Sequence, residues 1–528
     1  MLKINPKLIF TALLMSLFLF GFESQAQKTT KNPKEFLITN YGAKADGKTV
    51  NTIAIQKAID AAFKNKGGQV IFPKGRFLSG SIVMKSNVGL YFEEEAVLLG
   101  STNPKDYSNM AFVGRPISPK ADDNSQMALI LANKANNIAI KGKGTIDGQG
   151  LQLALNIDSL HHAGVAIDPK YNLRRNRPNE TMRPKLFRFS QCDSVLIEGL
   201  KVGEASCWGL SFELCSNLTL DKLTIVNRSY WNNDGIDITD CKNVKVVNCD
   251  INAADDGICL KSYYPGYSND SIYIANCTIK SSASAIKFGT ASFGGFKNVV
   301  IKDIKVYDTF RSAIAIESVD GAIIENIDVS NIDAVNTGNA IFIRLGQRSG
   351  DKPGSIKNLS IKNINVQVPF GRPDINYDLR GPEVDFFHNP FPSSIVGIPG
   401  YKIENVSLEN ITISYPGRAT KGMAYIPLSR LNQVPEAAKD YPEFSMFGEL
   451  PAYGFYVRHV NGISFKNIKI TLDDTDFRPA FVFDDVQNLK MTQIDLPKEK
   501  SSQVVLKAVT SSTLDEELVN QKLKIQNK

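Results

Sequence analysis

A unit of alternating apolar and polar residues recurs along this 528-residue chain. Each copy begins with Asn or Asp, alternates through an apolar run, turns, and alternates again. Examples are DSVLIEGLKV at 193, SNLTLDKLTIVN at 216 and KNVKVVNCDI at 242, and GISFKNIKITL at 462 is the last clear copy. The spacing is 23 to 28 residues through the middle of the chain. This pattern predicts an all-β fold, a single-stranded right-handed parallel β-helix whose stacked coils share one core.

A continuous stack favours one long domain at residues 27–497 over several smaller ones. A β-propeller is the competing architecture, but its period of about 40 residues is longer than the one found here. Thr52 is expected to cap a helix that runs to about Lys64, with Ile53, flanking Ile55, Ala58, Ile59 and Ala62 on its apolar face. This helix would plug the open N-terminal end of the solenoid. Residues 498–528 are expected to form a C-terminal tail or cap, with a short helix near Leu514–Leu523.

The first 26 residues have the pattern of a signal peptide. Lys3 and Lys7 precede an apolar run at 8–22, and Ser24-Gln25-Ala26 offers a cleavage site. No later apolar run reaches membrane length. We therefore expect a secreted or periplasmic protein without a membrane span, acting as a monomer.

Composition excludes some partners. The net charge is +7, but there is no dense Lys/Arg block and no nucleic-acid motif, so nucleic acid is not an expected partner. The excess charge suits a polyanionic substrate, although ordinary solvated lysines explain it equally well. No cofactor is expected, and no metal, since CxxC spacing is absent and only four histidines occur.

The seven cysteines all lie between Cys192 and Cys277. Their spacing follows the repeat, which favours stacked interior side chains, because Cys buries like a small apolar residue. A disulfide between Cys241 and Cys249 is the alternative.

Three carboxylates stand out in the middle of the repeats. Asp234 lies in the sequence NND, and Asp255 and Asp256 follow it by 21 and 22 residues in ADDG. On neighbouring coils about 4.8 Å apart, these side chains would meet on one face. Crowding of like charges raises at least one pKa and is typical of sites that carry out chemistry. Ordinary turn capping by Asp is the competing interpretation.

The segments NNDGID at 232 and DDG at 255 resemble glycoside hydrolase family 28, the polygalacturonase family. Ser206-Cys207-Trp208, Cys259-Leu260-Lys261-Ser262 and the opening YGAKADG resemble it too. The resemblance covers Phe36 to about Asp495 and implies inverting hydrolysis by paired carboxylates. It implies that Asp255 is the general acid, that Asp234 and Asp256 hold and deprotonate a water, and that Asn232 and Trp208 contact substrate.

Two departures from the family pattern concern substrate binding. Ser284 stands where the family often has His, and Ala315 and Glu317 replace both cations of an R-I-K motif that binds a substrate carboxylate. Lys287 and Arg311 are candidate replacements, Arg344 is a further one, and Glu317 would repel a uronate or hydrogen-bond a neutral sugar. His459 is expected to be structural.

The sequence therefore predicts an exported glycoside hydrolase that cleaves an acidic polysaccharide. Pectin, including its rhamnogalacturonan regions, is the leading substrate. A polysaccharide lyase or epimerase on the same fold, with the aspartates as a Ca²⁺ site, is one alternative. A non-catalytic carbohydrate-binding β-helix is the other, and fold alone does not decide between them.

Overall fold

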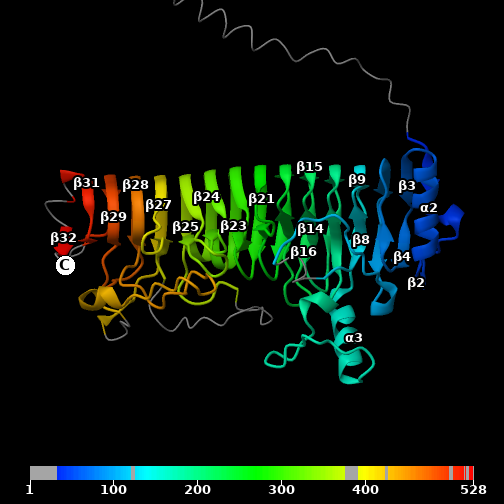
Figure 1. Ribbon diagram of the computed structural model, residues 1–528, viewed down its shortest axis with the longest axis horizontal. Coiled ribbons are helices and arrows are strands. Elements are labelled where there is room, and N and C mark those ends of the chain that lie inside the picture. The colour runs from blue at the N-terminus through cyan, green and yellow to red at the C-terminus, as the bar shows by residue number, and fades with distance from the viewer. Residues whose placement is uncertain are drawn as a thin grey trace, which may run out of the picture. The chain divides into compact units, whose positions relative to one another are not determined.

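The computed structural model describes residues 33–119, 125–374, 391–421, 426–498, 503–516, 518 and 523–526. The predicted signal peptide lies outside them. Residues 35–528 form one compact unit, whose strands pair in parallel into one continuous β-helix (Figure 1). The fold predicted from the repeat is confirmed. None of the described helices is long and apolar enough to cross a membrane.

Three ladders of parallel strands form the walls, and the longer strands turn corners and contribute to more than one. Ladder 1 comprises β5 (Ile82–Val83), β8 (Ala128–Asn133), β11 (Lys185–Ser190), β14 (Leu210–Glu213), β17 (Ile236–Thr239), β20 (Ile258–Ser262), β22 (Ile286–Ser292), β23 (Gly295–Ser318), β24 (Ile323–Leu345), β26 (Ser393–Val396), β28 (Phe455–Leu472), β29 (Phe481–Asp495), β30 (Val504–Lys507) and β32 (Leu523–Gln526).

Ladder 2 comprises β1 (Glu35–Leu37), β3 (Gly68–Phe72), β6 (Val88–Phe92), β9 (Asn136–Gly142), β12 (Asp193–Glu198), β15 (Ser216–Asp221), β18 (Lys242–Val247), β21 (Asn269–Ser281), β23, β24, β25 (Ser355–Gln367), β27 (Ile403–Tyr415), β28, β29 and β31 (Thr510–Leu514). Ladder 3 comprises β2 (Asp46–Val50), β4 (Gly75–Ser79), β7 (Ala96–Gly100), β10 (Thr145–Asp147), β13 (Lys201–Gly203), β16 (Thr224–Asn227), β19 (Asp250–Ala253) and later parts of β21, β23, β24, β25, β27, β28 and β29.

The core is a set of apolar columns that run along the solenoid. On ladder 1, Ile236 pairs with Ile258, which pairs with Ile286, which in turn pairs with Ile314. All four side chains are buried. The residues between them point to the other face of the strand, because side chains alternate. Ladder 1 thus presents an outward row that insertions can cover.

The Asn that opens many repeats sits in a turn with left-handed backbone, which Asn tolerates better than most residues. Asn298, Asn326, Asn358 and Asn405 have φ between 53° and 59°. The side-chain amides of Asn326, Asn358 and Asn405 each donate to the Asn of the preceding coil, at 3.1, 3.2 and 3.2 Å, and Asn298 donates to Asp270 at 2.9 Å. The sequence repeat therefore encodes a ladder of amide hydrogen bonds as well as a core.

The N-terminal cap contains β1, the 3-10 helix η1 (Ile38–Tyr41) and α2 (Thr52–Lys64). Ile55, Ala58, Ile59 and Ala62 of α2 are buried, whereas the predicted core residue Ile53 is 73% exposed. The expected cap by Thr52 is wrong, since Asn51 precedes the helix. The Thr52 hydroxyl instead accepts from the Gly80 amide at 2.8 Å and joins α2 to the end of β4.

At the C-terminal end, β30 and β31 pair with β29, and β32 pairs with β30. These strands extend the solenoid, so the tail contributes further coil structure. The helix expected near Leu514–Leu523 falls mostly outside the described residues.

All seven cysteines lie in the described part of the chain, buried and unpaired. Cys192, Cys215 and Cys241 occupy matching positions on successive coils, and each thiol donates to the carbonyl two residues before it, at 3.4, 3.5 and 3.3 Å. The stacked interpretation is confirmed, and no Cys241–Cys249 disulfide forms.

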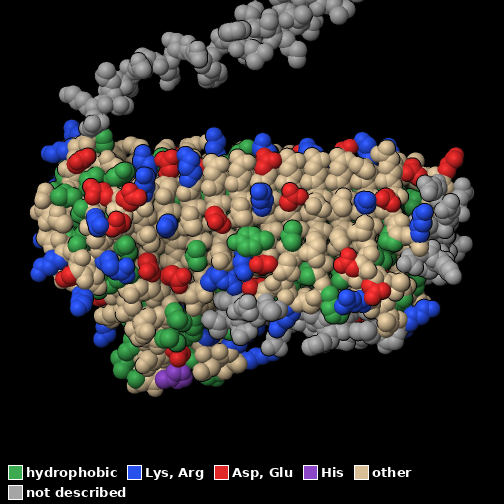
Figure 2. All heavy atoms as spheres, turned by 180° about the vertical axis from the view of Figure 1, so that it is seen from behind, with side chains coloured by type: hydrophobic (Ala, Val, Ile, Leu, Met, Phe, Trp, Pro, Cys, Tyr) green, Lys and Arg blue, Asp and Glu red, His purple; other side chains and the backbone are tan. Residues whose placement is uncertain are grey.

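Two insertions leave the solenoid on the same side (Figure 1). Residues 150–183, here called the arm, contain α3 (Gly150–His162) and the 3-10 helix η3 (Glu180–Met182). The described residues of 426–456, here called the 426–456 loop, contain the 3-10 helix η5 (Leu428–Gln433). Seen from behind, the wall of coils mixes acidic and basic side chains, and the arm stands out as a lobe (Figure 2).

Candidate active site

Two stacked turns hold the aspartates. Asp234 lies in the turn before β17, and Asp255 and Asp256 lie in the turn before β20. The Asn233 side chain is buried and donates to the carbonyls of Ala205 and Cys207, at 2.9 and 2.7 Å. The Gly235 amide donates to the Asp256 carbonyl at 2.9 Å. The backbone thus fixes one turn directly over the other.

The three aspartates line one cleft of about 310 Å³ on the outer face of ladder 1. Predicted residues Trp208, Asn232 and Lys287 line it as well. The other lining residues are Glu180 of the arm, Lys261, Tyr263, Gly289, Thr290, Ala291, Arg348 and Tyr441 of the 426–456 loop. The cleft therefore lies between the two insertions, with the solenoid as its floor.

Lys261 binds two carboxylates beneath Trp208. Its ammonium donates to Asp234 at 3.0 Å and to Asp237 at 2.5 Å, and it lies 4.3 Å from the Trp208 ring centroid. Burial, together with the charge of Asp237, raises the pKa of Asp234 well above its usual value. One ammonium serves two buried carboxylates, so Asp234 and Asp237 compete for its charge.

Asp234, Asp237 and Cys259 place one ligand atom each within 4.8 Å of one another. All three residues accept hydrogen bonds from the Lys261 ammonium, with Cys259 Sγ at 3.0 Å. The lysine thus supplies at this point the positive charge that a cation would otherwise bring.

Asp255 and Asp256 differ in their partners and in their pKa. Lys287 lies 3.3 Å from an Asp256 oxygen, and the Ser284 amide donates to Asp256 at 3.2 Å. Burial would raise the pKa of Asp256, but Lys287 and then Lys261 outweigh it and hold that pKa below its usual value. Burial and the charge of Asp256 raise the pKa of Asp255. Asp255 therefore keeps its proton to a higher pH than Asp256, as an acid/base pair requires.

Arg311 and Glu317 lie behind the cleft wall, outside its lining. Arg311 forms an ion pair of 2.7 Å with Glu443 of the 426–456 loop. Glu317 is 2% exposed, and burial raises its pKa to about 8. The raised pKa favours the protonated form of Glu317 and so weakens the like-charge repulsion expected of this residue. Direct substrate contact by Arg311 or Glu317 has no support in the lining.

A profile of the family described as glycosyl hydrolases family 28 matches residues 65–369, more than half of the chain. This chain belongs to glycosyl hydrolases family 28. A probable polygalacturonase of Vitis vinifera is 24% identical over 414 residues, covering 73% of this chain and 75% of the relative. An exo-poly-alpha-D-galacturonosidase of Dickeya chrysanthemi is 24% identical over 446 residues, covering 72% of each.

The fold agrees with that assignment. The crystal structure of a hyperthermoactive exopolygalacturonase from Thermotoga maritima aligns with a TM-score of 0.57 at 20% identity, over 73% of this chain and 88% of that one. The resemblance seen in the NND and ADD segments is thereby confirmed, and this family 28 chain is a glycoside hydrolase.

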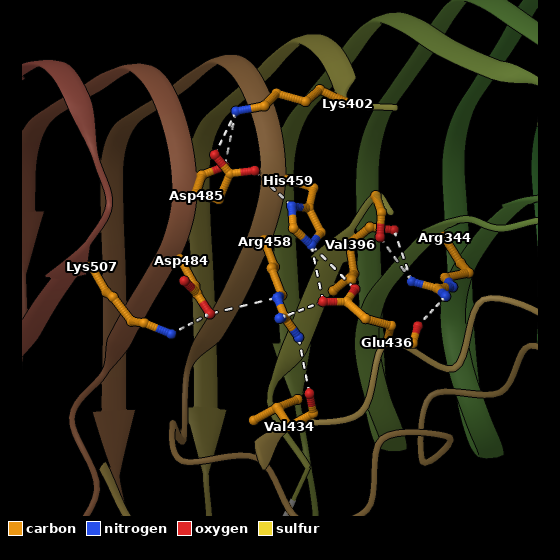
Figure 3. A network of polar contacts seen from close by, with 11 residues as sticks. Arg344, Val396, Lys402, Val434, Glu436, Arg458, His459, Asp484, Asp485 and Lys507 are labelled. Atoms are coloured by element: carbon orange, nitrogen blue, oxygen red, sulfur yellow. Dashed lines mark hydrogen bonds and ion pairs between the residues drawn. The ribbon is translucent and has the colours of Figure 1, made fainter. Parts of the chain in front are cut away.

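A polar network fastens the 426–456 loop to the coils of this family 28 chain (Figure 3). We call it the Glu436 clasp. The carboxylate of Glu436 pairs with Arg458, and it faces His459 Nε2 at 3.1 Å. Arg344, one of the candidate uronate ligands, donates to the Glu436 carbonyl at 2.6 Å and to the Gly397 carbonyl at 3.0 Å. Arg344 therefore binds backbone, and His459 is structural as expected.

The clasp continues onto the next coils. His459 Nδ1 lies 2.6 Å from Asp485, which also accepts from Lys402 at 2.7 Å. Arg458 donates to the Val434 carbonyl at 3.0 Å. The clasp lies a few residues before Tyr441 and Glu443, so it fixes the segment that brings Tyr441 to the cleft and Glu443 to Arg311.

Sequence reasoning missed Lys261, Asp237, Tyr441 and Glu443. Lys261 and Asp237 stand on strands flanking the acids, where alternation places them on the same outward face as the site. That signal was available from register. Tyr441 and Glu443 come from an insertion with no periodicity, so nothing in the sequence tied them to the aspartates.

Proposed function

We propose that this chain is an exported enzyme that hydrolyses glycosidic bonds of pectin with inversion of configuration. The observation that carries the proposal is the meeting of Asp234, Asp255 and Asp256 in one cleft of a family 28 chain. The printed names of the relatives, polygalacturonase and exo-poly-alpha-D-galacturonosidase, support pectin as the substrate class.

In the proposed mechanism, Asp255 donates its proton to the oxygen of the leaving sugar. Asp256, kept ionised by Lys287, removes a proton from water on the other side of the bond. Asp234, held by Lys261, orients that water. An inverting enzyme needs about 6.5–9.5 Å between acid and base so that the water fits.

The sugar on the leaving side is proposed to be neutral, such as rhamnose in rhamnogalacturonan. Ala315 stands at the position of one lost cation. The cations nearby are already paired with carboxylates: Lys287 with Asp256 at 3.3 Å, Arg311 with Glu443 at 2.7 Å and Arg348 with Asp320 at 2.6 Å. A uronate placed there would compete with these internal pairs.

The reaction class is tested by the products of the purified enzyme. Hydrolysis with inversion should give saturated ends whose first-formed anomer, followed by NMR, is opposite to that of the substrate bond. Products with an unsaturated uronate, detected by ultraviolet absorbance, would replace the proposal with a lyase.

The substrate preference is tested by kcat/KM on homogalacturonan and on rhamnogalacturonan. We expect the higher value on rhamnogalacturonan. A strong preference for homogalacturonan that disappears in Lys287→Ala or Arg311→Ala would show that these cations bind the uronate after all.

Export through a signal peptide at residues 1–26 is part of the proposal, with the plant cell wall as the site of action. The support is the basic, apolar and small-residue order of that segment. Expression with and without residues 2–26, followed by fractionation, tests it. Equal amounts outside the cytoplasm in both cases would contradict it.

A further inference from the structure

The arm places a group of arginines at one end of the cleft. Arg175 and Arg177 both lie over the ring of Trp231, with guanidinium carbons 5.0 and 4.1 Å from its centroid. Arg177 also donates to the Asn232 side chain at 3.3 Å, and Arg183 donates to the same oxygen at 2.8 Å. The three arginines lie outside the cleft lining, but Asn232, which two of them bind, lines it two residues before Asp234, so the arginine group extends the cleft beyond Asn232.

Positive charge is in excess at this end. Glu180 lies 3.7 Å from Arg177 and 3.8 Å from Arg183, and among the described residues no other carboxylate is within ion-pair distance of the three guanidinium groups. Arg175 has no carboxylate partner in the described part of the chain. Burial, followed by the nearby Arg183, lowers the pKa of Arg177 to about 10, while Asp255 acts on it in the opposite direction.

The loop that carries Arg175 is held in a fixed shape. Asp168 is buried and accepts from the amides of Lys170 and Asn179 at 2.8 and 2.6 Å, which closes the segment between them. The Tyr171 hydroxyl donates to Asp158 of α3 at 2.6 Å. Arg175 is half-buried within this closed segment, so its position over Trp231 costs little further ordering when a ligand arrives.

The chemistry of the group selects an anion. A guanidinium stacked on an aromatic ring keeps its N–H edge free for the two oxygens of a carboxylate. Arg183 is fully buried and donates to the carbonyls of Ser206 and Trp231 at 2.7 and 2.6 Å, so it is a support for the group. The other end of the cleft has its cations paired internally, as described above.

We propose that Arg175, backed by Arg177 on the Trp231 ring, is a subsite for the carboxylate of a uronosyl residue of the substrate. The inference rests on the proposed function, in which the substrate is an acidic polysaccharide. Together with a neutral leaving-side sugar, it describes a cleft that accepts a polymer with alternating acidic and neutral residues.

Arg175→Gln tests the subsite, and Arg174→Gln is the matched control. Arg174 is exposed on the same loop and does not stack on Trp231, so both variants lose one charge at nearly the same place. On rhamnogalacturonan oligosaccharides, Arg175→Gln should raise KM roughly five- to tenfold with little change in kcat, the effect of one charged hydrogen bond in a half-exposed site. Arg174→Gln should leave both constants nearly unchanged. On the methyl esters of the same oligosaccharides, Arg175→Gln should have no effect.

Equal losses on the acid and the ester, or equal losses in both variants, would overturn the subsite in favour of a structural or long-range role. Calorimetry on the full-length Asp255→Asn protein measures binding of the same oligosaccharides without turnover. It therefore tests the subsite independently of the reaction class. Weaker binding after adding Arg175→Gln supports the subsite even if the chemistry proves not to be hydrolysis. The subsite is overturned if the acid oligosaccharides do not bind, or if they bind equally well with and without Arg175→Gln.

Discussion

At the scale of single residues, the partner of each carboxylate decides what it can do. The ammonium of Lys287 lowers the pKa of Asp256, burial and the charge of Asp256 raise the pKa of Asp255, and burial raises the pKa of Glu317 to about 8. All are acidic residues on adjoining coils, and only the family resemblance, not their spacing, assigns them different roles from the sequence. Their roles follow from Lys287 and Lys261, whose side chains reach them only in the folded solenoid.

The first prediction at this scale concerns the general acid. Asp255→Asn should lower kcat by roughly 10²–10⁴-fold, because the amide has no proton to donate to the leaving oxygen. Its circular dichroism and Tm should match the parent, since Asp255 is only half-buried. Asp250→Asn, an exposed change on β19 of the same coil, is the control and should keep full activity. Near-normal turnover by Asp255→Asn would remove this residue from the mechanism.

The second prediction concerns the pH profile of kcat/KM. In the proposed mechanism, activity requires ionised Asp256, whose pKa Lys287 holds below its usual value against burial. Lys287→Met removes that ammonium, so the pKa of Asp256 rises and activity is lost at a higher pH on the acidic side than in the parent. Lys287→Arg keeps the charge and should keep the acidic limb near its original position. An unmoved limb in Lys287→Met would show that Asp256 is not the base.

At the scale of elements, the 426–456 loop is the part of the cleft that the solenoid does not itself dictate. The Glu436 clasp ties it to β24, β28 and the turn of β29, and the Gln347 amide adds a bond of 2.7 Å to the Ala438 carbonyl. Tyr441 and Glu443 follow directly, so their position depends on contacts two coils or more from the aspartates.

Loosening the clasp should therefore act on substrate binding. Glu436→Gln removes the charge that Arg458 and His459 face, and we expect KM to rise several-fold, with faster proteolytic cleavage within 426–456. Glu404→Gln breaks the surface pair with Lys357 and serves as the control, because exposed pairs contribute only about 0–1 kcal/mol. If a protease cleaves Glu436→Gln no faster than the parent, and its KM is unchanged, the clasp does not position the loop.

The elements that follow the sequence repeat could be predicted from the sequence, and those that interrupt it could not. Residues one repeat apart lie at matching positions on neighbouring coils. The coils, the asparagine turns and the proximity of Asp234 to Asp255 could therefore be predicted from the repeat length. Thr52 was misassigned because its hydroxyl bonds to a strand end distant in sequence. The arm and the 426–456 loop have no period, and the pairing of Arg311 with Glu443 joins residues that no local pattern connects.

At the scale of the whole molecule, stability comes from one uninterrupted stack. Columns such as Ile238, Leu260, Phe288 and Ile316 pass beneath the cleft and continue on both sides of it. Each coil depends on its neighbours for burial, as is typical of solenoids. The turns that carry the aspartates therefore rest on a continuous floor, and five of the seven cysteines, Cys192, Cys215, Cys241, Cys249 and Cys277, belong to the same apolar core.

The last prediction follows from those cysteines. Cys249 and Cys277 stack on adjacent coils, and their thiols donate to the carbonyls of Val247 and Ala275 at 3.2 and 3.3 Å. Because all seven are unpaired, the protein unfolded in guanidinium without reductant should react with seven equivalents of a thiol reagent. The folded protein should react far more slowly, since every thiol is buried. A disulfide would add about 2–4 kcal/mol to the free energy of unfolding, and its reduction would lower the Tm. Because the seven thiols are free, reductant should leave the Tm unchanged. Fewer than seven reactive thiols, with a Tm that falls on reduction, would show that the solenoid is cross-linked after all.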